Sequence, residues 1–439
     1  MASSNRLSLT AAILINLNIM LGSGIFINVI LLTQQADALS PLAYPLVGLM
    51  IFPLIAAFSI LLAQIPGGTF YEIGSTIHPL AGFVSSWGYF IGKLASAALS
   101  MHISVTTAQQ LMPALQTISP FFLDALLLVV FVLLTIFNVK TGRPVQYLFF
   151  SLKAIALAIG IGIGFAYFEP MHFIYATYPW AHLPSTVPFI LFAFAGFEAS
   201  CSLSKSIENP KKNGPRAIMF SYAIVLTVVT LYQLALYGAL GSMIKDLSTF
   251  REPFVAILSR MSGFYPTLSS LLLGGALAGI ATSALGASYG ILYSNIWNLQ
   301  TLASYKTIPF SKQLTKLNRF YAPVACIFVA AFLMLCYLAG SRGNIVPLQL
   351  ISASANTLSY SISIVAFLML CFGTLKQHRF IALLSVGSCL LLIAATLVNA
   401  FTYGTLPYLV YGILIAIGVL IHLVYQRKSI QKKIECKQT

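Results

Sequence analysis

The 439-residue chain is poor in charged residues, which make up 8% of the sequence, and only nine residues are acidic. Hydrophobic residues make up 59% and the mean hydropathy is +0.90, so this composition cannot supply the surface of a soluble globular protein. The sequence therefore predicts an integral membrane protein of the all-α class. It also lacks any soluble segment longer than about 25 residues, which leaves no room for a separate soluble domain.

Motifs that define several other function classes are missing. The six cysteines are scattered without paired spacing, which predicts free thiols and no disulfide framework. The six histidines lack the spacing typical of metal sites, so we expect neither a metal nor a cofactor. There is no phosphate-binding glycine loop, and Ser23, Cys201 and His102 have no supporting catalytic motif. ATP-driven pumping by this chain alone is excluded, and an enzyme is not expected.

Long apolar runs are what the chain contains in abundance. Each run has about 20 residues or more, enough to cross a hydrocarbon core of about 30 Å. The first run is too long for a signal peptide and lacks a cleavage site of small residues, so we expect the mature chain to begin at or near Met1. We predict twelve spans, at residues 8–33, 41–64, 79–112, 121–139, 144–168, 185–205, 214–241, 265–302, 321–340, 347–373, 379–400 and 405–425.

The net charge of +15 does not indicate a nucleic-acid partner, because the basic residues follow the predicted loops. If the N-terminus is cytoplasmic, eighteen Lys and Arg residues fall in inner loops and the C-terminal tail, whereas the outer loops hold four, namely Lys245, Arg251, Arg260 and Arg342. The positive-inside rule then predicts that both termini are cytoplasmic. We expect a bacterial inner membrane protein with a basic cytoplasmic tail at residues 426–439, where contact with anionic lipid is an alternative to a pure orientation signal.

Three charged residues fall inside predicted spans: Lys93, Lys153 and Glu198. Each costs roughly 2.5 to 3.5 kcal/mol at the bilayer centre, so we expect each to face the bundle interior or an aqueous cavity. For Lys153 and Glu198 we favour a functional role over a structural one. The other acidic residues lie at a helix edge (Asp124), in loops or in the tail, where solvation explains them.

Two predicted spans are interrupted by small residues at corresponding positions. Residues 22–24 of the first span read GSG, and residues 195–197 of the sixth read AGF, followed directly by Glu198. Paired interruptions of this kind point to the binding site of an inverted-repeat transporter. We therefore predict a first repeat at residues 1–168, a second at 185–373, and two additional helices within 379–425.

Unwound backbone within a bilayer is tolerated only where its polar groups meet protein, water or a ligand. The half-helix that follows residues 22–25 presents free amides and a positive dipole end, which suit a carboxylate. The half-helix that precedes residues 194–196 presents carbonyls, which suit an ammonium group. Together the two breaks predict a receptor for an α-amino acid. The alternative is that the glycines only allow close helix packing, which explains their pairing poorly.

Four motifs in this order carry a resemblance to a known family: GSGIF in span 1, VQYLFFSLKAI in span 5, FAFAGFEAS followed by IENPKKNGPRA in span 6 and the next loop, and SALGASYGIL leading through IPF to APVA. Over spans 1 to 10 the chain resembles the amino acid, polyamine and organocation (APC) superfamily, and within it bacterial amino acid permeases and antiporters such as the arginine/agmatine antiporter. The resemblance implies a leucine-transporter-type fold, a 5+5 inverted repeat with discontinuous helices 1 and 6. It also implies amino acid transport by alternating access, through exchange or proton coupling.

The resemblance implies a set of site residues as well. Phe192 matches an aromatic lid that closes over the substrate, and Glu198 matches an acidic residue implicated in substrate release, pH response or cationic substrates. Lys153 matches a lysine that takes the place of a sodium ion, either as a permanent brace of span 5 against span 1 or as a group that loses its proton during coupling. The implied substrate contacts are Gly22, Ser23, Gly24, Ile25, Tyr89, Phe192, Ala193, Ala195, Gly196, Glu198 and Ile291.

Departures from the family pattern leave the substrate open. Ile291 replaces a gating tryptophan, and span 10 offers Tyr360 in place of a proline-tyrosine pair. Lys93 lies one helical turn beyond Tyr89 and so shares its face. There it places positive charge near the site and disfavours polyamines, or it snorkels, or it pairs with Glu198 and leaves the site nearly neutral. A polyamine or basic amino acid antiporter is therefore the alternative function, and a non-transporting sensor or a channel is less favoured.

The C-terminal spans, residues 379–400 and 405–425, carry no identifiable site residues. We leave open whether they serve packing or contact within a homodimer. The expected partners are thus a small-molecule substrate, the lipid bilayer and, if transport is coupled, protons.

Overall fold

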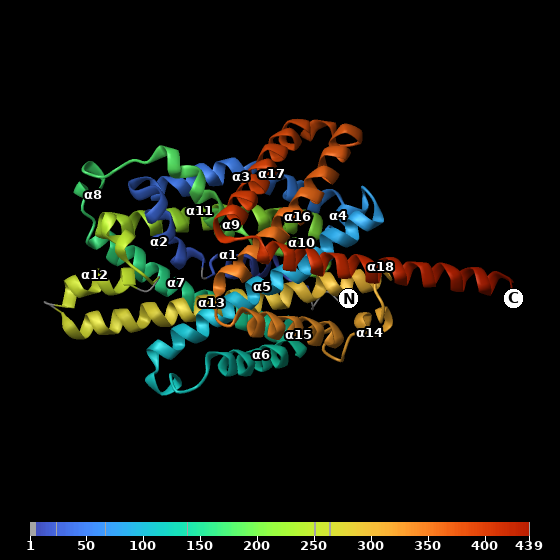
Figure 1. Cartoon of the computed structure of the whole chain (residues 1–439), viewed down its shortest axis with the longest axis horizontal. Helices are drawn as coiled ribbons and strands as arrows, with labels where there is room; N and C mark the ends of the chain where they lie inside the picture. Colours follow the sequence, from blue (N-terminus) through green and yellow to red (C-terminus); the bar gives the residue numbers. More distant parts are fainter. Residues whose placement is uncertain are drawn as a thin grey trace.

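The computed structural model describes residues 6–22, 24–65, 67–137, 139–249, 252–262 and 265–438. Over these residues the chain is all-helical (Figure 1), apart from an isolated β-bridge between Leu7 and Ile207. The predicted all-α class is confirmed. The α-helices are α1 (Leu9–Met20), α2 (Gly24–Ala36), α3 (Ser40–Gln64), α4 (Phe70–Ser75), α5 (Pro79–Leu111), α6 (Pro120–Ile136), α7 (Val139–Ala166), α8 (Met171–Ile174), α9 (Val187–Phe194), α10 (Ala199–Ser202), α11 (Pro210–Leu240), α12 (Glu252–Ser262), α13 (Pro266–Ser304), α14 (Ser311–Thr315), α15 (Val324–Ser341), α16 (Ile345–Gly373), α17 (Arg379–Tyr403) and α18 (Leu406–Gln438).

Within the described ranges, eight helical segments are long and apolar enough to cross a bilayer. A pair of segments at residues 180–186 and 189–202, bent by 41°, counts as a ninth if the two form one span. By length and hydropathy α2 and α3 count as one segment, and α1 and α6 are shorter apolar helices. The count of twelve spans remains a prediction.

Helices α7 and α18 extend furthest beyond their predicted ends. Helix α7 already begins at Val139, and α18 continues through the basic tail to Gln438, projecting from the bundle at the right in Figure 1. Residues 426–438 contain neither Gly nor Pro and are rich in Lys and Gln, which favour helix. The segment predicted as a separate tail is therefore an extension of the last helix.

The long helices of the bundle pack against one another in four main pairs. Helix α3 packs on α11, α5 on α13, α5 on α16, and α7 on α13. Gly92 of α5 and Gly279 of α13 each lie thirteen residues after the first residue of their helix. A Cβ at Gly92 would overlap Ala355 of α16, and one at Gly279 would overlap Ala156 of α7. The same small-residue contact thus occurs at equivalent points of two helix pairs, where it lets the backbones approach closely.

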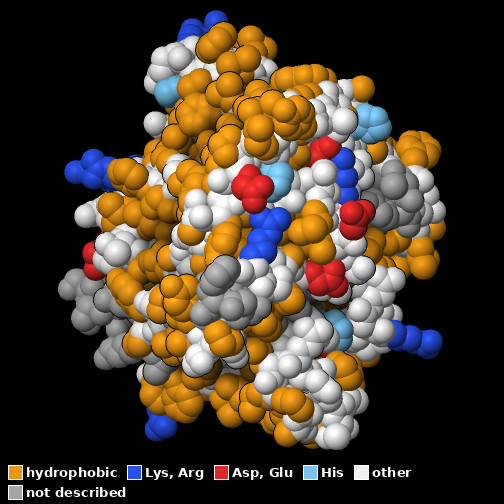
Figure 2. All heavy atoms as spheres, turned by 90° about the vertical axis from the view of Figure 1, so that its left-hand side faces the viewer, with side chains coloured by type: hydrophobic (Ala, Val, Ile, Leu, Met, Phe, Trp, Pro, Cys, Tyr) orange, Lys and Arg blue, Asp and Glu red, His pale blue; other side chains and the backbone are white. Residues whose placement is uncertain are grey.

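Short helices and turns close the two ends of the bundle. Helices α4 and α14 lie at the right-hand end in Figure 1, and α8 and α12 lie at the left-hand end. Figure 2 shows the left-hand end face-on, with acidic and basic side chains close together among hydrophobic ones. Of the elements at this end, Arg260 donates to Glu169 at 3.0 Å and Lys245 donates to Asp37 at 2.6 Å.

Asp124 differs from its prediction as a solvated residue at a helix edge. Its side chain is 1% exposed within α6, and its Oδ2 lies 2.8 Å from Nδ1 of His102 in α5. A buried carboxylate requires a partner, and His102 supplies one across the helix interface.

Candidate functional site

The first break separates α1 from α2. Helix α1 ends at Met20, Leu21 caps it through a hydrogen bond from its amide to the Leu17 carbonyl, and α2 begins at Gly24. Ser23, a predicted substrate contact, lies outside the described residues. A Cβ at Gly24 would lie 2.9 Å from Cδ1 of Phe192, so the absence of a side chain lets α2 start directly against that ring.

The second break separates α9 from α10. Helix α9 ends at Phe194, Ala195 is extended, and Gly196 has a φ of +135°, a conformation essentially confined to glycine. The Gly196 amide donates to Oε2 of Glu198 at 2.7 Å. A Cβ at Gly196 would lie 2.6 Å from Cγ2 of Ile19 in α1, so glycine is required both by conformation and by the proximity of the other break.

The four half-helices are cross-linked between the two breaks. Asn28 of α2 donates to the Phe189 carbonyl of α9 at 2.8 Å, and Asn16 of α1 donates to Oγ of Ser200 in α10 at 2.9 Å. Helix α2 therefore lies beside α9, and α1 lies beside α10, so the two breaks lie side by side.

Lys153 of α7 holds the carbonyl end of α1. Its side chain is fully buried, and its Nζ donates to the carbonyls of Asn18 at 2.8 Å and Leu21 at 2.7 Å. Ser283 of α13 also donates to the Leu21 carbonyl, at 2.7 Å. A cation at a helix C-terminus satisfies carbonyls that have no intrahelical partner and complements the helix dipole. Lys153 thus links α7 to the end of α1; a permanent brace and a proton carrier both remain predictions for it.

Glu198 lies directly beyond the second break and is fully buried. Its Oε1 accepts from Nζ of Lys93 and from the hydroxyl of Tyr89, both at 2.9 Å. Lys93 and Tyr89 share one face of α5, as predicted from their spacing. In the structure Lys93 both pairs with Glu198 and lines a cavity between the breaks.

A small cavity of about 20 Å³ lies between the breaks. It brings together five predicted site residues, Gly22, Gly24, Phe192, Ala195 and Ile291. The other predicted residues of the described ranges do not line it: Ile25, Ala193, Gly196, Tyr89 and Glu198. A cavity of this size holds about one water molecule, so binding of an amino acid requires the surrounding helices to move apart.

Four residues that line the cavity were not predicted: Ile19, Met20, Ser96 and Ser100. The two serines follow Lys93 on α5 at helical spacing, so the face that carries Tyr89 continues through Ser100. That periodicity was the signal available for them. Ile19 and Met20 carried no signal, because nothing local distinguishes them from other apolar residues of α1.

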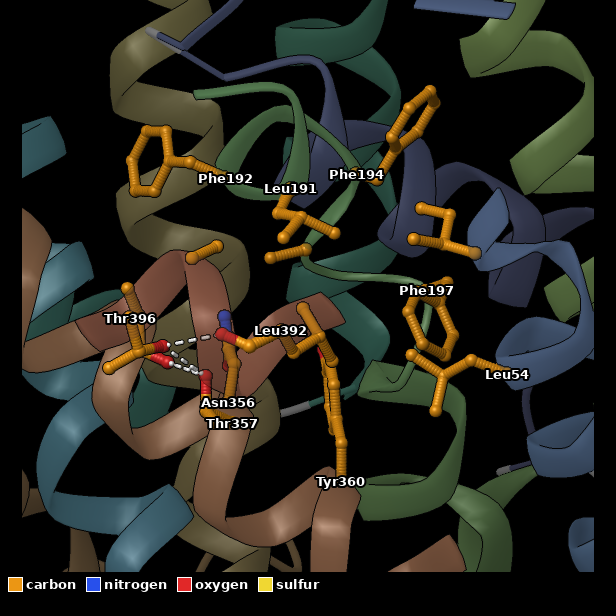
Figure 3. Close-up of a pocket in the computed structure, with 14 residues that line it drawn as sticks. Leu54, Leu191, Phe192, Phe194, Phe197, Asn356, Thr357, Tyr360, Leu392 and Thr396 are labelled. Atoms are coloured by element: carbon orange, nitrogen blue, oxygen red, sulfur yellow. Dashed lines mark hydrogen bonds between the residues drawn. The ribbon is translucent and has the colours of Figure 1, made fainter. Parts of the chain in front are cut away.

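A second cavity, of about 40 Å³, lies on the other side of Ala195 between α3, α9, α16 and α17 (Figure 3). Phe192 and Ala195 border both cavities. The wall of the second cavity is largely apolar, with one polar strip where the Thr357 and Thr396 hydroxyls lie 2.9 Å apart. The part of the chain that the structure describes holds no group of three or more His, Cys, Asp or Glu placed to bind a metal ion.

Comparison with known proteins gives two findings. Residues 7–421 match the family model described as "Amino acid permease". Proteins named as uncharacterized transporters of Mycobacterium bovis and Mycobacterium tuberculosis are 27% identical to the chain over 255 residues, which is 54% of this chain and 53% of each relative. The chain thus spans about half the length of the curated relatives that it matches.

Proposed function

The chain belongs to the amino acid permease family, as its motifs predicted, and we propose that it is a secondary active transporter that moves amino acids across the membrane by alternating access. One observation carries the proposal: α1 ends at Met20 and α2 begins at Gly24, α9 ends at Phe194 and α10 begins at Ala199, and a cavity lies between these two breaks. Broken helices are tolerated in a membrane where their free backbone groups line a cavity or meet a ligand.

Each break offers one half of a receptor for a zwitterion. The first amides of α2, from Gly24 onward, have no intrahelical acceptors and form a positive dipole end for the substrate carboxylate. The carbonyl end of α9, at Phe194 and Ala195, is the counterpart for the substrate ammonium group. Phe192 borders the cavity beside Gly24, a position suited to an aromatic lid. The predicted substrate contacts are retained as the proposed site.

The reciprocal helix packing supports the proposed 5+5 inverted repeat. If residues 1–168 and 185–373 are equivalent, α5 corresponds to α13 and α7 to α16. The contacts of Gly92 with α16 and of Gly279 with α7 are then the same contact made once in each repeat. In this arrangement α17 and α18 follow the second repeat, where packing and homodimer contact are both open roles.

Alternating access requires a closure at each end of the bundle that can open separately. At one end, Asp37 accepts hydrogen bonds from Lys245 at 2.6 Å, from Tyr237 at 2.7 Å and from Thr177. These bonds join the segment between α2 and α3 to the end of α11 and to the loop before α9. We propose this carboxylate as the centre of the outer closure.

At the opposite end, Glu72 of α4 accepts from Lys205 at 2.9 Å and from the Tyr305 hydroxyl at 2.6 Å. Burial acts to raise the pKa of Glu72, but hydrogen bonds from Tyr305, Lys205 and Thr69 and the Lys205 charge outweigh it and lower that pKa below its usual value. The carboxylate is thus ionised at neutral pH. With both termini in the cytoplasm of a bacterial cell, this is the proposed inner closure.

Coupling to exchange or to a proton gradient is assigned to Lys153 and Glu198. Lys153 contacts the carbonyl end of α1, so a change in its protonation would change the first break directly. Glu198 contacts the Gly196 amide and has the same connection to the second break. An ion-coupled cycle would act through these two contacts, whereas a pure exchanger would keep both charges fixed.

Transport by purified protein in liposomes tests the function. We expect uptake of a labelled amino acid in a counterflow panel, and loss of nearly all uptake in Gly24→Trp, which fills the cavity, and in Phe192→Ala, which removes the lid. Gly274→Ala is the matched control, because a Cβ at Gly274 meets nothing within 4 Å. Unchanged uptake in both site variants would remove the proposed site.

A further inference from the structure

Lys93 is a charged residue in the wall of the proposed substrate cavity. Its side chain is 3% exposed, and it lines the cavity together with Gly22 and Gly24 of the first break. Its Nζ lies 2.9 Å from Oε1 of Glu198, which is 0% exposed. An ammonium group and a carboxylate are therefore buried as a contact pair next to both breaks, where their formal charges cancel.

Both oxygens of Glu198 already accept hydrogen bonds in this arrangement. Its Oε1 accepts from Lys93 and Tyr89, and its Oε2 accepts from the Gly196 amide. A ligand ammonium or guanidinium group would have to displace Lys93 and leave that lysine buried without its carboxylate, which is strongly unfavourable.

The other buried carboxylates among the described residues have partners away from the breaks. Asp37 accepts from Lys245 at the outer end of the bundle, and Asp124 contacts His102 between α5 and α6. Neither borders either cavity at the breaks. Among the described side chains around these two cavities, Lys93 is the only charged one, and the wall of the second is largely apolar.

From these contacts we infer that the Lys93–Glu198 pair is the charge filter of the site, which restricts it to amino acids with uncharged side chains. The backbone ends at the two breaks neutralise the α-carboxylate and α-ammonium groups, and no charge is left over for a third ionised group. The additional charged group of lysine, agmatine or glutamate would enter a low-dielectric space without a counter-ion, which is energetically costly. This inference rests on the proposed function for the location of the site.

Removing the charge of one member of the pair at a time should shift ligand preference in opposite directions. Lys93→Met keeps the length of the side chain and frees the Glu198 carboxylate, so cationic ligands gain a counter-ion. Glu198→Gln keeps the shape of the carboxylate and frees the Lys93 ammonium, so anionic ligands gain one. The double variant removes both charges and returns the wall to neutrality. A purely structural ion pair would lower stability in the single variants without changing the order of ligands.

The experiment measures the half-saturating concentrations of leucine, alanine, lysine, agmatine and glutamate for the purified full-length protein, by ligand-induced thermal stabilisation. The proteins compared are the wild type, the two single variants, the double variant, Lys93→Arg, which keeps the charge, and Lys312→Met, which removes an exposed lysine distant in sequence from the site. We expect the wild type, Lys93→Arg, Lys312→Met and the double variant to favour the neutral amino acids.

In Lys93→Met the half-saturating concentrations of lysine and agmatine should fall about tenfold or more relative to leucine, and in Glu198→Gln that of glutamate should fall similarly. If Lys93→Met does not fold, Glu198→Gln and the double variant decide the question in the same way. Equal binding of lysine and leucine by the wild type, or one ligand order in all variants, would overturn the inference. Neutral amino acid binding without uptake into liposomes would instead overturn the transport function and leave the charge filter standing.

Discussion

Replacing Gly196 by alanine tests the second helix break at its most constrained point. Gly196 has a φ of +135°, and holding a residue with a side chain in such a conformation costs about 1–3 kcal/mol. The added Cβ would also lie 2.6 Å from Cγ2 of Ile19 and 3.0 Å from Cγ of Met20. Carbon atoms pack best at about 3.5–4.0 Å, and overpacking of this kind costs about 1–3 kcal/mol.

The reduced entropy of the unfolded chain offsets about 0.4–1 kcal/mol of this cost. We therefore expect Gly196→Ala to lower the free energy of unfolding by about 1–6 kcal/mol and to abolish uptake, because Ile19 borders the cavity. Gly162→Ala is the control: nothing lies within 4 Å of its added Cβ, and replacing a helical glycine by alanine should stabilise α7 by about 0.5–1 kcal/mol.

Both free energies are measurable by denaturant titration in mixed micelles, and uptake by the liposome assay. A Gly196→Ala protein whose free energy of unfolding lies within about 0.5 kcal/mol of the wild-type value, and which transports normally, would refute the description of this break. Reduced stability with normal uptake would show that the break is structural and does not contribute to the site.

Two further predictions concern charged residues beside the site and at the inner closure. Lys153→Met removes the ammonium group that donates to the Asn18 and Leu21 carbonyls. We expect loss of uptake with only a modest change in stability, because removing the cost of burying an ammonium group offsets part of the free energy lost with the hydrogen bonds. Proton-driven uptake retained in full would rule out coupling through Lys153. Glu72 has a lowered pKa in the folded protein, so its ionised form stabilises the fold above the unfolded pKa of about 4.3, and this stabilisation is lost as the pH falls through the folded pKa. Glu72→Gln should thus lower the thermal midpoint at pH 7, and the gap between the two proteins should narrow as the pH falls through the folded pKa of Glu72; a gap that stays constant on acidification would contradict the ion pair with Lys205.

Features that depend on short stretches of chain were predictable. The apolar runs predicted helices because backbone groups in a bilayer must bond within their own segment, and residues 22–24 and 195–197 indicated breaks because small residues weaken a helix. The match of residues 7–421 to the amino acid permease family agrees with the four motifs on which the resemblance was based. The continuation of α18 was not predicted, because the apolar run that indicates a membrane span ends before the helix does.

Contacts between helices far apart in the sequence could not be predicted from short stretches of chain. The sequence did not decide whether Lys93 faces the site, snorkels or pairs with Glu198, and only the packing of α5 against the second break places its Nζ beside Glu198. Asp124 was assigned to solvent until the approach of α5 gave it His102 as a partner. Burial of a charge depends on which helix faces it, and hydropathy within one helix does not contain that information.

The order of residues along the chain is sufficient for the class of the fold, the family and the two positions at which helices break, since propensity and hydropathy act over a few neighbouring residues. Tertiary structure decided that the breaks meet, that Lys153 caps the first of them, and that the charge of Glu198 is balanced by Lys93. These outcomes depend on electrostatic and steric contacts between segments far apart in sequence, and such contacts exist only once the helices have packed.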